Sequence, residues 1–320
     1  MTCYAPWVKT HGALAAKRPL ACGQCIGCRL KRSREWATRC VHESQLHDES
    51  MFITLTYDEE HLPSPATLSH RDFQLFMKKL RQHVENIDST SKEKPTKCTP
   101  LCTGDITKNR EINFPEKQKA KPTLSYYMSG EYGEKNLRPH FHACVFGFNF
   151  QDRQYHQKTK IGETIYTSKT LTKIWGKGYA SIGAVTFASA AYIARYIVAK
   201  ITGPNAKAHY TTFDEKTGTF FERKPEYNKM SLHPALGKRW LEKYQDDVYP
   251  HGYIVINGHK VQAPRYYDEL YKTAHPKEFK KLQETRQQEA NLQKAETTPK
   301  RLADRETVQQ AQAGQLKRKL

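Results

Sequence analysis

Hydrophobic and polar residues alternate along two neighbouring stretches of the chain, residues 125–132 and 138–145, in the way that is typical of β-strands. Both stretches are rich in aromatic and β-branched residues, and the short connector between them contains glycine and asparagine, which favour turns. The pattern predicts a β-hairpin. If Glu131 lies opposite His140, the polar side chains share one face, whereas a slip of one residue would mix polar and apolar side chains. On this register Glu131, His140 and His142 form one cluster.

Other stretches show similar periods. Residues 52–57 alternate and contain β-branched residues, which predicts a further strand. After Ser69, an expected N-cap, apolar residues recur with the period of a helix, and we expect these side chains in the core: Phe73, Phe76, Met77 and Leu80. Residues 253–258 end in an Asn-Gly pair, a hairpin signal. From Pro276 onward the chain is charged and glutamine-rich, which is typical of a polar helix or a disordered tail.

A second helix is predicted for residues 187–201, with its end near Gly203. Its isoleucines and alanines cluster on one face, while Tyr192, Tyr196 and Lys200 follow one another on a separate face, each about 40° from the one before. Tyrosines that served only packing would be expected among the apolar residues, so this placement favours hydroxyls presented to a partner. Tyrosines that merely decorate a solvated face are the alternative interpretation.

The predicted hairpin carries a set of side chains suited to a metal ion. Two imidazoles and a carboxylate fit a divalent metal with open coordination positions, and this nitrogen and oxygen set does not choose among Mg²⁺, Mn²⁺ and Zn²⁺. The alternative is an exposed strand face with ordinary histidines. A metal matters for the tyrosines, because a phenol with its ordinary pKa of ~10 is a poor nucleophile at neutral pH. A metal, or a nearby Lys200, would offset that weakness.

The eight cysteines need an interpretation other than disulfides. The N-terminus lacks the basic start and apolar core of a signal peptide, so we expect the chain in a reducing cytoplasm. Cys22, Cys25 and Cys28 form a C-x-x-C-x-x-C run, and the glycines between them let the backbone turn tightly. Three thiolates at this spacing could bind a structural Zn²⁺, with Cys3 or Cys40 as the fourth ligand. A reduced, cysteine-rich turn is the alternative.

The charge of the chain favours polyanionic partners. Lysine and arginine number 52 against 33 aspartates and glutamates, which leaves a net charge of +19 and favours association with nucleic acid. No apolar run approaches the ~18 residues that span a bilayer, so we expect no membrane partner. Composition divides the chain into a Cys-rich basic N-terminal segment, a core with a polar insertion, a C-terminal subdomain and a polar charged tail: residues 1–45, 46–205 with the insertion 86–123, 206–270 and 271–320.

Taken together, these motifs resemble the HUH endonucleases, in which two histidines flank a bulky hydrophobic residue, here Phe141. More closely, the chain resembles the replication initiation proteins of the Microviridae, the gokushovirus type of single-stranded DNA bacteriophages, in the two-tyrosine class of that superfamily. The resemblance covers most of residues 1–270. It is carried by residues 22–25, 52–57, 130–133, 138–142, 192–196 and 264–268.

The resemblance implies an α+β fold, with a central antiparallel β-sheet of the HUH-endonuclease (RRM/ferredoxin-like) type and flanking helices. It implies Mg²⁺ or Mn²⁺ on His140 and His142, with a polar third ligand that we place at Glu131. It also implies that a tyrosine cuts origin DNA, keeps the 5′ phosphate and leaves a free 3′-OH, after which the second tyrosine allows strand transfer and ligation. Tyr192 and Tyr196 match this motif, and either could act first.

The same resemblance implies the partners. They are single-stranded DNA and the double-stranded replicative form at the origin, in the cytoplasm of a bacterial host, with a DNA polymerase extending the 3′-OH. The sequence contains no G-x-x-x-x-G-K-[ST] loop, so unwinding is expected from a separate host helicase. Arg138, Arg195 and Lys200 are candidates for phosphate contacts.

Three other functions remain open. A transposase or plasmid relaxase would share the metal and tyrosine chemistry and differ in its DNA substrate. A non-catalytic single-stranded nucleic-acid-binding protein would keep every activity when Tyr192 and Tyr196 are changed to phenylalanine. A metallo-hydrolase using activated water would cut DNA without becoming attached to it.

Overall fold

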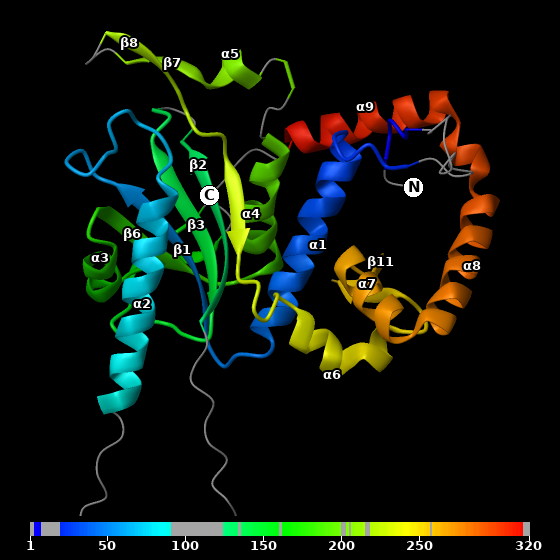
Figure 1. Ribbon diagram of the computed structural model, residues 1–320, viewed down its shortest axis with the longest axis horizontal. Helices are drawn as coiled ribbons and strands as arrows, with labels where there is room; N and C mark the ends of the chain where they lie inside the picture. Colours follow the sequence, from blue (N-terminus) through cyan, green and yellow to red (C-terminus); the bar gives the residue numbers. More distant parts are fainter. Residues whose placement is uncertain are drawn as a thin grey trace, which may run out of the picture.

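The computed structural model of the protein describes most of the chain. The described residues are 3–7, 20–90, 124–133, 136–159, 162–199, 203–204, 206–214, 218–256 and 258–315, without the side chains of residues 88, 90 and 196–199. Lys200 and most of the predicted insertion 86–123 therefore lie outside the described residues. The N-terminal segment meets the rest of the chain near the start of α1 (Figure 1).

A seven-stranded antiparallel sheet forms the centre of the molecule, in the order β4-β5-β6-β1-β3-β2-β9 (Figure 1). Its strands are β1 (Ser50–Tyr57), β2 (Ser125–Tyr132), β3 (Pro139–Phe146), β4 (Gln154–Lys158), β5 (Thr164–Thr167), β6 (Gly178–Gly183) and β9 (Tyr227–Met230). Two separate hairpins are β7 (Thr211–Asp214) with β8 (Thr219–Glu222) and β10 (Tyr253–Ile256) with β11 (His259–Gln262). The predicted α+β fold with a central antiparallel sheet is confirmed, as is the hairpin expected at residues 253–258.

One face of the sheet is covered by α2 (His70–Thr90) and α3 (Lys169–Trp175). α2 begins directly after Ser69, and its predicted apolar stripe is buried: Phe73, Phe76, Met77 and Leu80. Ser168 caps α3 by accepting a hydrogen bond from the Leu171 amide, at 3.0 Å. Because β-strand side chains alternate, this face receives Ile53, Leu55 and Phe141 and leaves their neighbours on the opposite face.

The opposite face packs against α1 (Ile26–Ser44) and α4 (Phe187–Ala199), which lie side by side to the right of the sheet in Figure 1. Small and apolar residues of both helices are buried there with residues of the strands: Ala37, Cys40, Ala190, Ile193, Ala194, Phe52, Tyr127, Cys144 and Phe146. Ser33 of α1 donates a hydrogen bond to the carbonyl of Ala191, at 3.2 Å. The core face predicted for residues 187–201 is thus confirmed for the residues whose side chains are described.

A third core follows in the C-terminal part, between α6 (Lys238–Val248), α7 (Arg265–Ala274) and α8 (Pro276–Leu292). Trp240, Tyr267 and Tyr271 are buried there, joined by Phe279 of α8. The expected tail from Pro276 onward is therefore helical within the described residues, and its first helix contributes to a core. The remaining helices are α5 (Ala206–Tyr210), η1 (Lys294–Thr297) and α9 (Pro299–Gln315).

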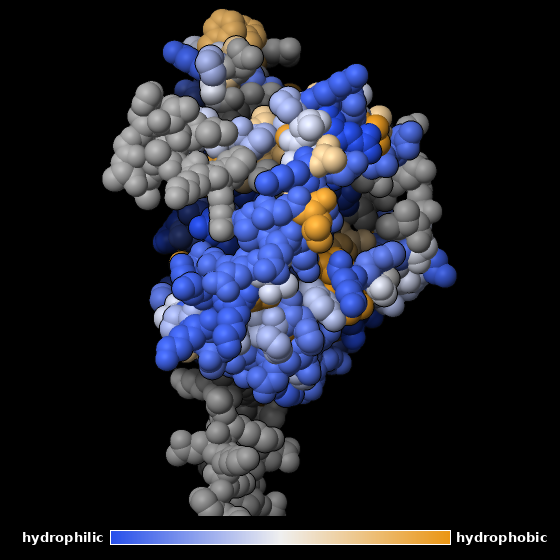
Figure 2. Space-filling view, turned by 90° about the vertical axis from the view of Figure 1, so that its right-hand side faces the viewer, coloured by the Kyte–Doolittle hydropathy of each residue, from blue (hydrophilic) through white to orange (hydrophobic). Residues whose placement is uncertain are grey.

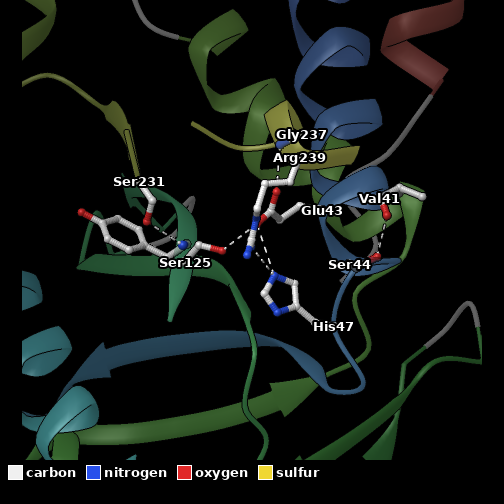
Figure 3. A network of polar contacts seen from close by, with 9 residues as sticks. Val41, Glu43, Ser44, His47, Ser125, Ser231, Gly237 and Arg239 are labelled. Carbon is white, nitrogen blue, oxygen red and sulfur yellow. Dashed lines mark hydrogen bonds and ion pairs between the residues drawn. The ribbon is translucent and has the colours of Figure 1, made fainter. Parts of the chain in front are cut away.

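A buried carboxylate connects these parts of the molecule (Figure 3). Oε1 of Glu43 on α1 accepts hydrogen bonds from Ser125 at 3.1 Å, Arg239 at 3.0 Å and His47 at 3.2 Å. Oε2 accepts one from the Gly237 amide at 2.8 Å. Burial raises the pKa of this carboxyl, but the hydrogen bonds and the Arg239 charge outweigh burial and lower the pKa to about 2. Glu43 thus ties α1 to the start of β2 and to the turn before α6.

The surface shown in Figure 2 is mostly hydrophilic, with apolar residues in small separate groups. Large exposed apolar side chains include Phe213 and Phe220 of the β7–β8 hairpin, whose rings lie 5.2 Å apart. Within the described part of the chain, no helix combines the length and apolar character that crossing a membrane requires.

Candidate metal centre and nucleophile

The β2–β3 hairpin has the register that the alternation of its residues predicts. Glu131 lies opposite His140 and Ser129 opposite His142. The hairpin closes where the Gly133 amide donates to the Arg138 carbonyl, at 3.0 Å. β1 pairs on the other side of β3 and places Thr54 opposite His142, so the histidines lie in the middle of the sheet rather than at its edge. A central position holds them more rigidly than an edge strand would.

Glu131, His140 and His142 point their polar atoms at one place. Oε1 of Glu131 lies 2.8 Å from Nε2 of His140 and 2.6 Å from Nε2 of His142. One donor atom from each of the three residues falls within 4.8 Å of the other two. The three residues singled out by the sequence are therefore brought together by the structure.

The far nitrogen of each histidine is held by a partner of its own. Nδ1 of His140 donates to the Arg138 carbonyl, at 3.1 Å, and Nδ1 of His142 lies 2.9 Å from the Thr54 hydroxyl. A carbonyl can only accept, so Nδ1 of His140 carries a proton and Nε2 is the nitrogen available to a metal. The ring of Phe52 stacks on that of His142, with centroids 5.6 Å apart. Such contacts fix ring orientation around a ligand set.

Burial and charge oppose each other within this cluster. Burial raises the pKa of the Glu131 carboxyl, but the charge of His142 and the hydrogen bonds from both histidines lower it below its usual value. Burial lowers the pKa of His140, but its hydrogen bond to Glu131 and the charge of that carboxylate raise it above its usual value. The cluster is thus held together electrostatically, with a carboxylate that stays ionised despite burial.

A divalent cation fits these residues. Glu131 is 1% exposed, yet its second oxygen, Oε2, is buried and makes no hydrogen bond to any described residue. A buried carboxylate oxygen without a donor is costly, and a cation would compensate it. The two imidazole nitrogens and the carboxylate leave coordination positions open toward a pocket of about 630 Å³, lined among others by Thr54, Arg138, both histidines and Tyr192.

Tyr192 lies beside this cluster. It is half-buried on α4, and its ring meets the ring of His142 edge-on, with centroids 5.1 Å apart. Tyr196 follows one turn later on α4, but its side chain lies outside the described residues, as does all of Lys200. Of the proposed tyrosine, tyrosine and lysine face, the structure thus places the first member at the metal ligands.

The two candidate phosphate-binding arginines differ in position. Arg138 lines the pocket, donates to the Tyr57 carbonyl at 2.8 Å and pairs with the exposed Glu59. Arg195 is a half-buried residue of α4 and does not line that pocket. Arg138 is therefore the one placed next to the candidate metal ligands.

The sequence interpretation missed Thr54 and Phe52, which support His142 from the neighbouring strand. A signal for them existed. Residues 52–57 alternate, so Phe52, Thr54 and Thr56 share a face, but nothing in the sequence says which strand lies next to β3. That pairing is a long-range property of the fold.

The cysteines form a second cluster, with Cys3 as its fourth member. One sulfur from each of Cys3, Cys22, Cys25 and Cys28 lies within 4.8 Å of the others. Of the two residues considered as a fourth ligand, Cys40 is instead fully buried between α1 and the sheet, beside Cys144. These four residues could hold a metal through sulfur alone.

Comparison with known proteins agrees with this geometry. The profile of a family of replication-associated proteins, described under the name ORF2, matches residues 101–201, a range that contains the hairpin and both tyrosines. Replication-associated protein VP4 of Bdellovibrio phage phiMH2K is 36% identical over 259 residues, which cover 81% of this chain and 69% of that protein.

Two further relatives are more distant. Replication-associated protein ORF2 of Spiroplasma virus 4 is 27% identical over 256 residues, covering 77% of this chain and 66% of the relative. Replication-associated protein ORF4 of Chlamydia phage 1 is 26% identical over 257 residues, covering 79% and 53%. No solved structure matches the chain. From its similarity to the Bdellovibrio phage protein and the family match, the chain belongs to the ORF2 family of replication-associated proteins of small single-stranded DNA phages.

Proposed function

We propose that this protein starts rolling-circle replication of a phage genome by nicking origin DNA through a tyrosine and later rejoining the strand. In this proposal it is a member of the two-tyrosine class of HUH endonucleases, of the Microviridae (gokushovirus) type. The observation that carries it is the edge-on contact between Tyr192 and His142, a residue of a buried Glu–His–His cluster whose carboxylate has an unpartnered oxygen. A nucleophile candidate beside a metal-binding set is what metal-assisted phosphoryl transfer needs.

The residues that would hold the catalytic metal are Glu131, His140 and His142, and we propose Mg²⁺ or Mn²⁺ as the physiological ion. When bound, the ion supplies Lewis-acid activation of the scissile phosphate and offsets its developing charge. Thr54 and the Arg138 carbonyl fix the two imidazoles from behind, so the ligand atoms need not reorganise during the reaction. The cysteine cluster belongs to different elements, and a structural Zn²⁺ there would take no part in nicking.

The chemical step belongs to the phenol of Tyr192. Its oxygen forms a bond to phosphorus as the bond from phosphorus to the 3′ oxygen breaks, and the phenolic proton ends on the departing 3′ oxygen. The product is a 5′-phosphotyrosine link and a free 3′-OH. One phosphodiester replaces another, so the reverse reaction can rejoin DNA without a nucleotide cofactor.

The helical spacing of the tyrosines provides the second half of the cycle. Tyr196 is one turn after Tyr192 on α4, so both backbones are presented to the same region of the sheet. After a round of synthesis, the second phenol would cut the regenerated origin, and the free 3′-OH would attack the first tyrosyl phosphodiester and close the circle. Lys200 is proposed to stabilise phenolate or leaving-group charge, and Arg138 and Arg195 to contact phosphates.

The partners follow from the same proposal. The DNA is the single strand and the double-stranded replicative form at the origin, and the +19 charge favours its binding. A host helicase would unwind the duplex and a DNA polymerase would extend the 3′-OH, in the cytoplasm of a bacterial host.

The test is an adduct assay with purified protein, Mn²⁺ or Mg²⁺, and circular single-stranded DNA from the phage that encodes the chain. Denaturing electrophoresis detects protein-bound DNA, and mass spectrometry of nuclease-trimmed peptides locates it. We expect a metal-dependent adduct on Tyr192 or Tyr196. Changing both to phenylalanine should lower the nicking rate at least about 1000-fold.

A matched control is Tyr155→Phe, which alters an exposed tyrosine on β4 and should leave adduct formation unchanged. Nicking without adduct, preserved in the double phenylalanine variant, would instead identify water as the nucleophile. Tight binding to the origin with no nicking in either metal would identify a binding protein.

A further inference from the structure

The four clustered cysteines come from two segments that the chain brings together. Cys3 lies in the N-terminal segment, and the other three lie in the turn that leads into α1 and in its first helical turn. Sγ of Cys3 and Sγ of Cys25 are 3.9 Å apart, and no cysteine of the cluster is in a disulfide. A disulfide would need sulfurs about 2.05 Å apart, whereas a tetrahedral metal with bonds of about 2.3 Å to sulfur needs about 3.8 Å. The spacing fits a shared metal.

The backbone around the cluster is arranged to stabilise thiolates. The amides of Gln24 and Cys25 donate to Sγ of Cys22, at 3.4 and 3.3 Å, and the amide of Cys22 donates to Sγ of Cys3, at 3.2 Å. The amide of Tyr4 donates to Sγ of Cys25, at 3.3 Å. Amide donors favour the charged form of an acceptor, and a thiolate is the form that binds metal.

The local chain conformation permits this close wrapping. Gly23 has a φ of +75°, in the left-handed region, which lets the chain turn back between Cys22 and Cys25. A Cβ at Gly23 would lie 3.9 Å from the Arg32 guanidinium, so positive charge is near the thiolates. Cys3 is 1% exposed, although it is in a short segment at the end of the chain. Burying a terminal cysteine among three others is what a fourth ligand requires.

We propose that Cys3, Cys22, Cys25 and Cys28 form a closed Zn²⁺ site that clamps the N-terminal segment to the first turn of α1 and so holds α1 against the tyrosine helix α4. Four thiolates prefer Zn²⁺, whereas Mg²⁺ and Mn²⁺ prefer harder oxygen and nitrogen ligands. The site has no fifth open position to offer a substrate. Its role is therefore structural.

The link from this site to α4 is short. Ser33, less than two turns after Cys28, donates to the carbonyl of Ala191, the residue before Tyr192. Further along α1, Ala37 and Cys40 are buried with Ala190 and Ile193 of α4. An α1 that frays at its first turn would loosen its contact with the segment that carries Tyr192. This positioning role rests on the proposed function of Tyr192, whereas the zinc site itself does not.

The first test measures metal in the full-length protein, reconstituted with Zn²⁺ or Co²⁺ under reducing conditions and then desalted. We expect one tightly held zinc per chain, and with Co²⁺ the thiolate charge-transfer and tetrahedral ligand-field bands of a four-sulfur site. Cys3→Ser should lose the zinc on desalting. Cys40→Ala, which removes the other cysteine considered as a fourth ligand, should keep it.

The second test reads hydrogen exchange without DNA. On zinc removal from the wild type, and in Cys3→Ser, the amides in the first turns of α1 and those around Ala191 should exchange at least about 10-fold faster, while β2 and β3 stay protected. A wild type that holds neither metal would overturn the site, and a four-sulfur cobalt spectrum in Cys3→Ser would overturn Cys3 as ligand. Unchanged exchange around Ala191 would overturn the positioning role. A protein that holds zinc but forms no tyrosyl adduct would disprove the proposed function and leave the zinc site standing.

Discussion

Glu131 and Glu43 are both buried, at 1% and 2% exposure, and both have a pKa below that of an ordinary carboxyl, but their surroundings differ. Oε1 of Glu43 accepts from three side chains, and Oε2 accepts from the Gly237 amide. Oε2 of Glu131 has no hydrogen-bond donor among the described residues, and Oε1 faces two imidazoles. One carboxylate is complete in the folded chain and the other is not.

The difference separates a structural role from a functional one. A buried charge whose hydrogen bonds are all made within the protein stabilises the fold and has nothing left for a ligand. A buried charge with an oxygen left over reduces stability until something binds, and such a trade is common at functional sites. Counting donors around each carboxylate thus assigns Glu43 to the fold and Glu131 to the proposed chemistry.

The largest predicted effect follows from removing the charge of Glu131. Glu131→Gln keeps the shape of the side chain but weakens the metal site, and we expect the nicking rate to fall about 1000-fold. In the wild type, Mn²⁺ should raise the melting temperature by mass action, and in Glu131→Gln that rise should vanish. Nicking assays and thermal melts with and without Mn²⁺ measure both.

Glu43→Gln is the reciprocal variant and should keep the rise with Mn²⁺. If instead Glu131→Gln kept the rise and Glu43→Gln lost it, the contrast between the two carboxylates would be reversed.

The next effect concerns stability. In Glu43→Gln an amide group replaces one carboxylate oxygen, so a donor faces the Gly237 amide or the Arg239 guanidinium. We expect a loss of about 3 kcal/mol in the free energy of unfolding, measured by urea denaturation at neutral pH. Nicking at low temperature should persist.

The same residue predicts an acid response. The folded pKa of Glu43 is about 2 and its ordinary value 4.5, so its contribution is complete above about pH 4.5 and disappears as the pH falls toward 2. The difference in stability between wild type and Glu43→Gln should therefore narrow over that range. A difference that stayed constant from pH 6 down to about 2.5 would show that the charge of Glu43 does not stabilise the fold.

The sequence predicted the features that depend on short-range patterns. Alternation alone placed Glu131 opposite His140, and helical period alone separated Tyr192 from Ile193, because each involves residues close along the chain. The amphipathic stripe of α2 was predicted for the same reason.

Features that join distant segments were not accessible in this way. The donors around Glu43 come from residues 125, 237 and 239, far along the chain, and no local pattern distinguishes Glu43 from other polar residues of α1. The choice between Cys3 and Cys40 depended on whether the N-terminal segment returns to the start of α1. Such pairings are set by tertiary packing, which a pattern in one sequence does not encode.

The smallest predicted effect tests whether the support of the metal ligands matters as well as the ligands. Thr54→Val keeps the shape of the side chain but removes the hydroxyl that meets Nδ1 of His142, so the ring loses the partner that fixes its orientation. We expect metal affinity, from Mn²⁺ titration of the thermal shift, to weaken about 10-fold, with a similar loss of nicking at low metal that excess metal restores. Thr56→Val is the matched control, because Thr56 lines the same pocket from the same strand but lies opposite His140, whose Nδ1 is held by the Arg138 carbonyl. Equal losses in both variants would mean that pocket polarity, rather than the orientation of His142, sets the affinity, and Thr54→Ser should then be no better than Thr54→Val.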